Sequence, residues 1–290
     1  MIEPADSPGP DAPRRRVLWW VVAVVAVQVM IVVVALTVPA SPTEVYRGTG
    51  PAGLIPVTEP PVAAEPTRAE FDRLVTNYLD DNPRLRAAVA IDTGDRVLRY
   101  GADERFETAS TVKLEILVRW LLLRQDEPLP ADETELARAM IVSSDNAATD
   151  TLCAIIAPWT PPDAVPGGTG ACAADGLWGT DLTDVDGLVQ VLDTAFRPGL
   201  LTDDSRALVR ELTGSVVPGQ AWGVTEAAGP DEPVWLKNGW DARDGGWIAH
   251  SVGRVGDVDI VVLTDGSPDY ETAVRHVVAL CTRIGDLLHP

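Results

Sequence analysis

An uncharged run of 22 residues near the amino terminus limits where a globular domain can form. Residues 17–38 carry no charge, and Gln28 is their only strongly polar member. A helix of about 20 apolar residues spans a bilayer. Trp19 and Trp20 lie beside the arginines at 14–16, where an aromatic interface belt and a cytoplasmic positive flank are expected. The pattern predicts a single-pass anchor, with a cytoplasmic tail before it and the rest of the chain outside.

A cleaved signal peptide is the alternative, because Val38-Pro39-Ala40 resembles a small-residue cleavage site. The apolar run is longer than the roughly 7–15 residues of a signal-peptide core, which favours the uncleaved anchor. In the first case the chain is a cell-membrane protein with an extracytoplasmic domain, and in the second it is secreted.

The remaining chain divides into a spacer and a folded part. Residues 1–16 form the polar tail, and residues 39–66 hold seven prolines and read as an extended linker. Residues 67–290 form the folded domain, and the apolar content of the chain, 46%, is ample for a core. The net charge of −20 argues against a nucleic-acid partner, which favours a basic surface.

The folded part alternates between strand-like and helix-like patterns. Strands are expected at 86–92, 96–100, 234–237, 246–254 and 257–264. Helices are expected after a capping box at Thr67-x-x-Glu70, at 109–123, 132–142 and 147–156, after a cap at Thr183, and at 203–212 and 272–288. Residues 157–182 read as a loop. The order predicts an α/β (α+β) fold, in which one antiparallel sheet from both ends of the domain lies beside a helical lobe.

The chain has three cysteines, and outside the cytoplasm a disulfide is permitted. Cys153 and Cys172 are the plausible pair, while Cys281 lies in an apolar helical pattern and is expected to be a buried thiol. Three free thiols remain the alternative. Neither the cysteine spacing nor the three scattered histidines resemble a zinc site, so no metal or other cofactor is expected.

Only two lysines occur in the chain, Lys113 and Lys237, although lysine and arginine together number 23. Arginine stays protonated, whereas a buried lysine can act as a base. Lys113 closes Ser110-x-x-Lys113, and residues three apart share a helix face. A serine hydroxyl becomes a nucleophile when a base takes its proton. A capping serine with a solvated lysine is the alternative interpretation.

Two further short motifs follow in the chain. Ser144-Asp145-Asn146 lies between two expected helices, where a side chain can point into a cleft or simply cap the next helix. Lys237-Asn238-Gly239 ends a strand-like run, where glycine permits close approach of a substrate backbone. Asn-Gly is also a common hairpin dipeptide, so a turn is the alternative there.

The three motifs together resemble the signature set of the serine β-lactamases and penicillin-binding D,D-peptidases, S-x-x-K, S-D-N and K-T-G. More narrowly, the segments at 106–110, 237–240 and 261–266 are similar to class A β-lactamase-like serine hydrolases of actinobacteria. The resemblance covers residues 67–290. It implies an antiparallel sheet flanked by helices and an all-α lobe.

The resemblance also implies catalytic roles. Ser110 would be the acylated nucleophile, and Lys113 would be its general base. Ser144 would relay a proton to the leaving nitrogen. The backbone N–H groups of Ser110 and Trp240 would form the oxyanion hole.

Substrate-binding roles follow in the same way. Asn146 would hydrogen-bond a side-chain amide of the substrate. Lys237 would supply positive potential toward a substrate carboxylate and Ser144. Asn238, Gly239 and Trp240 would line the substrate path along the strand.

The chain departs from the family pattern in three respects. Asn238 replaces a threonine or serine that normally helps to bind the substrate carboxylate, and Arg243 is the candidate replacement. Only 34 positions separate Ser110 from Ser144, which predicts a reduced helical lobe. Residues 157–182 offer no glutamate to activate a deacylating water, only the aspartates Asp163, Asp175 and Asp181. Without such a base, about 10²–10⁴-fold of catalysis is lost.

The sequence therefore predicts a membrane-anchored serine hydrolase that acts outside the cell through an acyl-serine intermediate. Its expected substrates are β-lactams or related amides, with the peptidoglycan stem peptide as a natural candidate. A penicillin-binding D,D-peptidase is the first alternative, and a low-turnover module that binds cell-wall fragments is the second.

Overall fold

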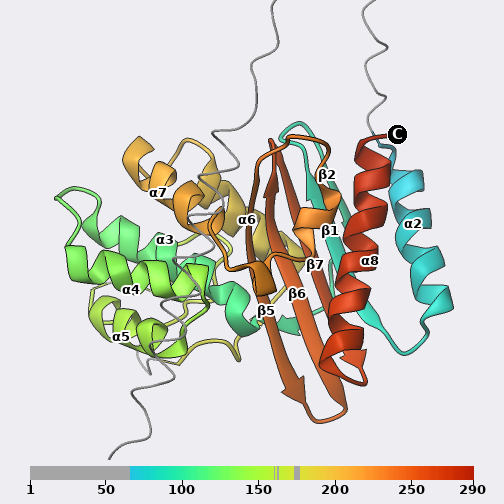
Figure 1. The fold of residues 1–290 in the computed structure, drawn as a ribbon, viewed down its shortest axis with the longest axis horizontal. Coiled ribbons are helices and arrows are strands. Elements are labelled where there is room, and N and C mark those ends of the chain that lie inside the picture. The colour runs from blue at the N-terminus through green and yellow to red at the C-terminus, as the bar shows by residue number, and fades with distance from the viewer. Residues whose placement is uncertain (1–65, 160, 162, 173–176) are drawn as a thin grey trace, which may run out of the picture. The chain divides into compact units, whose positions relative to one another are not determined.

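The computed structural model describes residues 66–159, 161, 163–172 and 177–290 (Figure 1). The predicted tail and anchor, and the predicted linker up to residue 65, lie outside these residues. Within the described part of the chain, no helix is both long enough and apolar enough to cross a bilayer.

The described residues form the expected helices and strands in the expected order, together with two short strands that the sequence analysis did not predict. The helices are α2 (Arg68–Asp81), α3 (Val112–Arg124), α4 (Ala131–Val142), α5 (Asn146–Ile156), α6 (Val185–Phe196), α7 (Asp203–Thr213) and α8 (Tyr270–Leu288). The strands are β1 (Arg86–Asp92), β2 (Val97–Tyr100), β3 (Phe106–Glu107), β4 (Leu182–Thr183), β5 (Val234–Arg243), β6 (Gly246–Val255) and β7 (Val258–Ser267).

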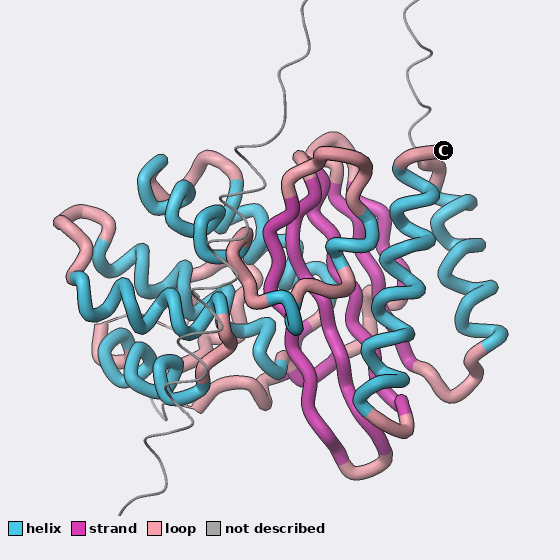
Figure 2. Tube along the Cα trace, in the orientation of Figure 1, coloured by secondary structure: helices cyan, strands magenta, loops and turns pink. Residues whose placement is uncertain are grey.

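One antiparallel sheet is built from both ends of the domain, as predicted. Its strand order is β2-β1-β7-β6-β5, so the first hairpin pairs with the last strand. Figure 2 shows this sheet as one layer, with α2 and α8 on one side and α3 to α7 on the opposite side. The short strands β3 and β4 pair separately beside the sheet. The mixed α/β architecture predicted from the sequence is therefore confirmed for the described residues.

Both faces of the sheet are buried, because alternate residues of its central strands face different cores. Ala88 and Ala90 of β1 pack in the core shared with the helical lobe. Val89 and Ile91 pack in the core under α2 and α8. This alternation follows from the two-residue repeat of a strand.

Several boundaries differ from the sequence predictions. The helix predicted at 109–123 is divided into a 3₁₀ turn (Ala109–Thr111) and α3, and α8 begins two residues before the predicted start at 272. The cap of α6 is Asp184, whose side chain accepts from Gly187 N, while Thr183 ends β4. The strand expected at 234–237 continues to Arg243, so Asn238-Gly239 lies within β5 and the turn interpretation is wrong. The capping box of α2 at Thr67 is present as predicted.

The cysteines are arranged as the sequence predicted. Cys153 of α5 and Cys172 form a disulfide. Cys281 of α8 is a buried free thiol, and burial raises its pKa. The disulfide ties the loop after α5 back onto that helix.

Candidate active site

Ser110 lies in a short 3₁₀ turn, η1 (Ala109–Thr111), immediately before α3. The turn is fastened to a distant loop: Thr108 N donates to Asp181 O and Ala109 N donates to Gly179 O, each at 2.9 Å. Ala109 has a φ of +46°, a conformation that residues other than glycine rarely adopt. Such backbone outliers concentrate at functional sites, and this one directly precedes Ser110, which lines a cleft.

Lys113 contacts two of the other predicted site residues, Ser144 and Asn146. Its side chain is fully buried, with 0% exposed. Nζ donates to Ser144 O at 2.7 Å, to Ser144 Oγ at 3.1 Å and to Asn146 Oδ1 at 2.7 Å. A protonated lysine has three N–H donors, so these acceptors occupy all of them. Burial lowers the pKa of Lys113 to about 8, although the charges of Asp145 and Asp150 oppose this shift.

Ser144 lies between α4 and α5 and connects the two lysines. Its φ of +58° turns it out of the helical path, and the following Asp145 caps α5 by accepting from Ala148 N at 2.7 Å. Lys237 Nζ donates to Ser144 Oγ at 3.0 Å, on the same oxygen that Lys113 contacts. A serine hydroxyl has two acceptor lone pairs and one donor, so Ser144 is suited to pass a proton between its neighbours.

Lys237 lies on β5 and is also buried, with 1% exposed. Its Nζ donates to Asn238 O at 2.7 Å. Burial, followed by the nearby charge of Lys113, holds the pKa of Lys237 well below its usual range. Two lysines on one hydroxyl therefore favour the release of a proton from the pair.

Gly239 brings β5 against the turn that carries Ser110. A Cβ atom at this position would lie 2.8 Å from Ser110 N and 2.7 Å from Thr111 N. Only glycine fits so close a backbone approach. Trp240 follows in the strand and lines the same cleft as Ser110. The two amides predicted to form the oxyanion hole thus belong to neighbouring backbones.

The structure assigns Asn238 a different position from the one predicted. Its side chain is buried, and Nδ2 donates to Gln220 O at 2.8 Å and to Trp222 O at 2.9 Å. These contacts hold the segment before β5 and turn the amide group away from the substrate path. Asn146 keeps its place at the cleft, although its Oδ1 already accepts from Lys113.

The cleft beside Ser110 has a volume of about 260 Å³. Its lining consists of Ala109, Ser110, Asn146, Trp178, Gly179, Thr180, Trp240, Asp241 and Arg243. Among the described residues of this lining, Asp241 is the only carboxylate, and it is bound to Arg243. Arg243 also pairs with Glu107 at 2.6 Å, so two carboxylates compensate its charge.

His250 is bound to backbone groups near the site, and both of its ring nitrogens are occupied, so it is not placed to act as a base. Thr264 N donates to its Nδ1 at 3.2 Å, so the ring proton belongs on Nε2, which lies 2.9 Å from Glu107 O. Complete burial lowers the pKa of His250 to about 4. Among the described residues, no group of three histidine, cysteine or acidic side chains could hold a metal ion.

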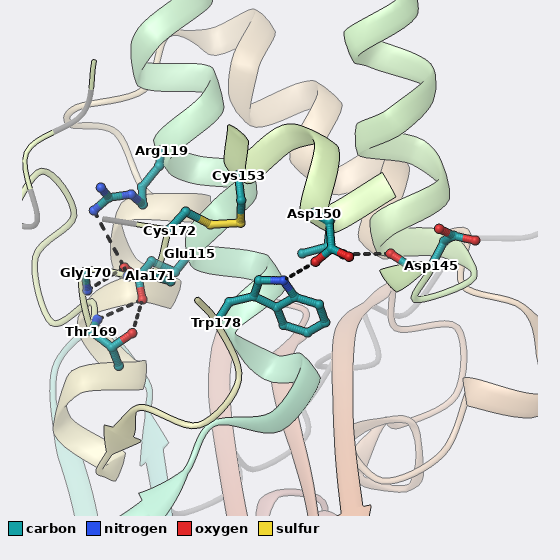
Figure 3. Close-up of a disulfide and its surroundings, with 11 residues drawn as sticks. Glu115, Arg119, Asp145, Asp150, Cys153, Thr169, Gly170, Ala171, Cys172 and Trp178 are labelled. Atoms are coloured by element: carbon teal, nitrogen blue, oxygen red, sulfur yellow. Dashed lines mark hydrogen bonds and ion pairs between the residues drawn. A yellow bond between two sulfur atoms is a disulfide. The ribbon is translucent and has the colours of Figure 1, made fainter. Parts of the chain in front are cut away.

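The loop that closes the cleft is organised by residues that the sequence analysis did not single out. Glu115 of α3 accepts from Thr169 N at 2.8 Å, Gly170 N at 3.0 Å and Ala171 N at 3.2 Å. The disulfide follows at Cys172, and Trp178 Nε1 donates to Asp150 Oδ1 at 2.8 Å (Figure 3). A lone acidic residue in the apolar run after Val112 was the available signal for Glu115. Trp178 gave no comparable signal.

Comparison with solved structures identifies the architecture. A class A β-lactamase from Bacteroides cellulosilyticus aligns with a TM-score of 0.60 at 15% identity, covering 75% of this chain and 98% of that chain. A β-lactamase from Desulfarculus baarsii gives 0.58 at 18% identity, covering 77% and 99%. PBP-A gives 0.60 at 15% identity, covering 76% and 96%. The fold is that of the serine β-lactamases and penicillin-binding proteins. The sequence matches no protein-family model and no curated protein.

Within this β-lactamase-like fold, the structure brings most of the predicted site residues together. Ser110, Asn146 and Trp240 line the cleft, while Lys113 and Lys237 both donate to Ser144 Oγ. Gly239 supports the close approach beside Ser110, and Asn238 alone points elsewhere.

Proposed function

We propose that the protein is a serine hydrolase that reacts with β-lactams or related amides through an acyl-enzyme on Ser110. The observation that carries this proposal is the shared contact of Lys113 and Lys237 with Ser144 Oγ, next to a cleft that contains Ser110. A penicillin-binding fold supports the same chemistry, since a solved variant of PBP-A is an acyl-enzyme complex with penicillin G.

Acylation uses the residues in a fixed order. Neutral Lys113 takes the proton of the Ser110 hydroxyl as Ser110 Oγ bonds to the substrate carbonyl carbon. The N–H groups of Ser110 and Trp240 receive the developing oxyanion. As the carbon–nitrogen bond breaks, the proton passes from Lys113 through Ser144 to the leaving nitrogen. Lys237 lies beside Ser144, where its protonated form would supply positive potential.

Hydrolysis of the acyl-enzyme is the weak step. The one carboxylate in the described lining of the cleft, Asp241, is bound to Arg243 and is not free to activate water. This arrangement favours a long-lived acyl-enzyme and supports the D,D-peptidase alternative more than rapid β-lactam turnover. Arg243 is itself neutralised by two carboxylates, so we expect weak recognition of a substrate carboxylate.

The cellular location of the domain is proposed from the sequence of residues 17–38. We propose that residues 17–38 anchor the chain in the cell membrane and that the domain lies outside, within reach of peptidoglycan stem peptides. The disulfide between Cys153 and Cys172 supports an oxidising compartment.

The decisive experiment incubates the full chain, in detergent, with benzylpenicillin and follows intact mass and β-lactam absorbance together. We expect one covalent penicilloyl adduct that persists for many minutes and is absent from Ser110→Ala. Loss of absorbance without a lasting adduct would show a working β-lactamase instead. If neither an adduct nor hydrolysis is observed, the proposed chemistry is refuted.

A further inference from the structure

Trp178 lies over Lys113 at the edge of the cleft that contains Ser110. Its ring centroid lies 4.8 Å from Lys113 Nζ, and it lines the same cleft as Ser110. Lys113 is left with no exposed surface. Asp241 is bound to Arg243, and Lys113 is the basic group that lies directly under the Trp178 ring.

The indole is held in place from several directions (Figure 3). Nε1 donates to Asp150 Oδ1 on α5, at 2.8 Å. Cys172 is bonded to Cys153 of the same helix, and Cys172 N donates to Leu177 O at 3.0 Å, directly before Trp178. Directly after it, Gly179 O accepts from Ala109 N at 2.9 Å. The ring therefore cannot leave Lys113 without breaking contacts on both sides.

The chemistry of the ring makes it a poor host for water. An ordered water in a protein needs about two to four polar partners. The indole presents an aromatic face to Lys113, and its single N–H group is already bound to Asp150. The three N–H positions of a protonated Lys113 are occupied by Ser144 and Asn146. A water between Trp178 and Lys113 would have neither space nor partners.

We propose that Trp178 is a positioning residue that denies water access to Lys113 and thereby prolongs the lifetime of the acyl-enzyme. This inference rests on the proposed acyl-serine chemistry and adds the reason why the adduct persists. Replacing the indole by a methyl group opens room for water next to Lys113. Neutral Lys113 then removes a proton from that water, and the water oxygen bonds to the ester carbonyl carbon. The bond between that carbon and Ser110 Oγ breaks as Lys113 returns the proton to Ser110 Oγ, so Ser110 leaves as the free hydroxyl.

The test measures the loss of the penicilloyl adduct after excess benzylpenicillin is removed, using the full chain. We expect Trp178→Ala to lose the adduct at least tenfold faster than the wild type, with a rate that rises with pH as Lys113 loses its proton. Trp178→Phe keeps a ring over Lys113 and should stay within about threefold of the wild type. Trp159→Ala removes an exposed indole, with 71% of its surface accessible, and should change nothing.

The outcomes separate the inference from the chemistry beneath it. An adduct on Trp178→Ala that lasts as long as on the wild type would overturn the inference and leave the acyl-serine chemistry intact. A wild type that hydrolyses penicillin rapidly would also overturn it. No adduct and no hydrolysis in any variant would refute the proposed function itself. If Trp178→Ala does not fold, as judged by its thermal transition, Trp178→Leu is measured in the same way with the same expectation.

Discussion

At the scale of single residues, one proton decides whether the site can react. Lys113 donates to three acceptors, the pattern of an ammonium group, and an ammonium cannot accept the proton of Ser110. The observed arrangement is therefore the resting state. Burial favours release of the proton, against the charges of Asp145 and Asp150, so the site becomes reactive within a pH range that proteins tolerate.

The rate of acylation should therefore follow the titration of Lys113. Because burial lowers the pKa of Lys113 to about 8, the rate should rise with pH below that value and level off above it. Below the midpoint, each pH unit changes the neutral fraction about tenfold. The measurement is the second-order rate constant for penicilloyl-adduct formation, followed by quenching and intact mass across this pH range.

Two variants test the assignment of this titration to Lys113. Lys113→Arg keeps a positive charge but cannot lose its proton, so acylation should fall by about 10²–10⁴-fold at every pH. Asp150→Asn removes a charge that raises the pKa of Lys113 but keeps an acceptor for Trp178, so the midpoint should move to lower pH. A Lys113→Arg enzyme that acylates normally would rule out lysine as the base.

At the scale of elements, the sequence predicts the order of the helices and strands better than the residues at which each one ends. Alternating apolar residues located the sheet strands and helical spacing located the helices, because both report which faces are buried. The end of β5 was missed because Asn238-Gly239 suits a turn locally. Pairing with β6 overrides that preference.

The candidate site likewise contains residues that the sequence predicts and residues that it does not. The three motifs identify Ser110, Lys113 and Ser144, since their chemistry depends on residue type and spacing. The direction of Asn238 depends on the carbonyl groups of Gln220 and Trp222, which are distant in sequence. The place of Trp178 depends on how the loop folds back, which no local pattern encodes.

The contact between β5 and η1 can be tested at Gly239. In Gly239→Ala, the new Cβ would lie 2.7–2.8 Å from the backbone nitrogens of Thr111 and Ser110, and backbone cannot yield as a flexible side chain does. We expect a loss of about 1–3 kcal/mol of unfolding free energy from overpacking, and at least about a hundredfold slower acylation because the oxyanion hole widens. Urea unfolding and adduct formation measure the two effects.

A matched glycine provides the control for this strand contact. Gly219 has no atom within 4 Å of an added Cβ and does not adopt a positive φ. Gly219→Ala should therefore leave acylation unchanged and unfolding free energy within about 1 kcal/mol of the wild type. Equal behaviour of the two alanine variants would mean that β5 does not shape the site.

At the scale of the whole molecule, a neutral histidine links the sheet to the site and to pH. His250 of β6 is fully buried and bonds both to β7 through Thr264 and to β3 through Glu107. Glu107 in turn pairs with Arg243 at the cleft. Protonation of His250 would place an imidazolium charge inside the sheet. It would also disrupt the Thr264 contact, which needs an unprotonated Nδ1.

The stability of the molecule should therefore fall in mild acid. Burial lowers the pKa of folded His250 to about 4, whereas an unfolded histidine titrates near 6.5. Between these values the unfolded chain binds more protons, so unfolding free energy is lost as pH falls from about 6.5 toward 4. The loss reaches roughly 3 kcal/mol at the lower limit, since each unit of pKa difference corresponds to about 1.4 kcal/mol.

Urea unfolding at a series of pH values measures this loss of unfolding free energy. His250→Gln is the comparison, because glutamine keeps a donor and an acceptor without titrating. Other acid-sensitive groups act in both proteins, so the difference between the two curves isolates His250. Parallel curves would show that His250 does not couple the sheet to pH.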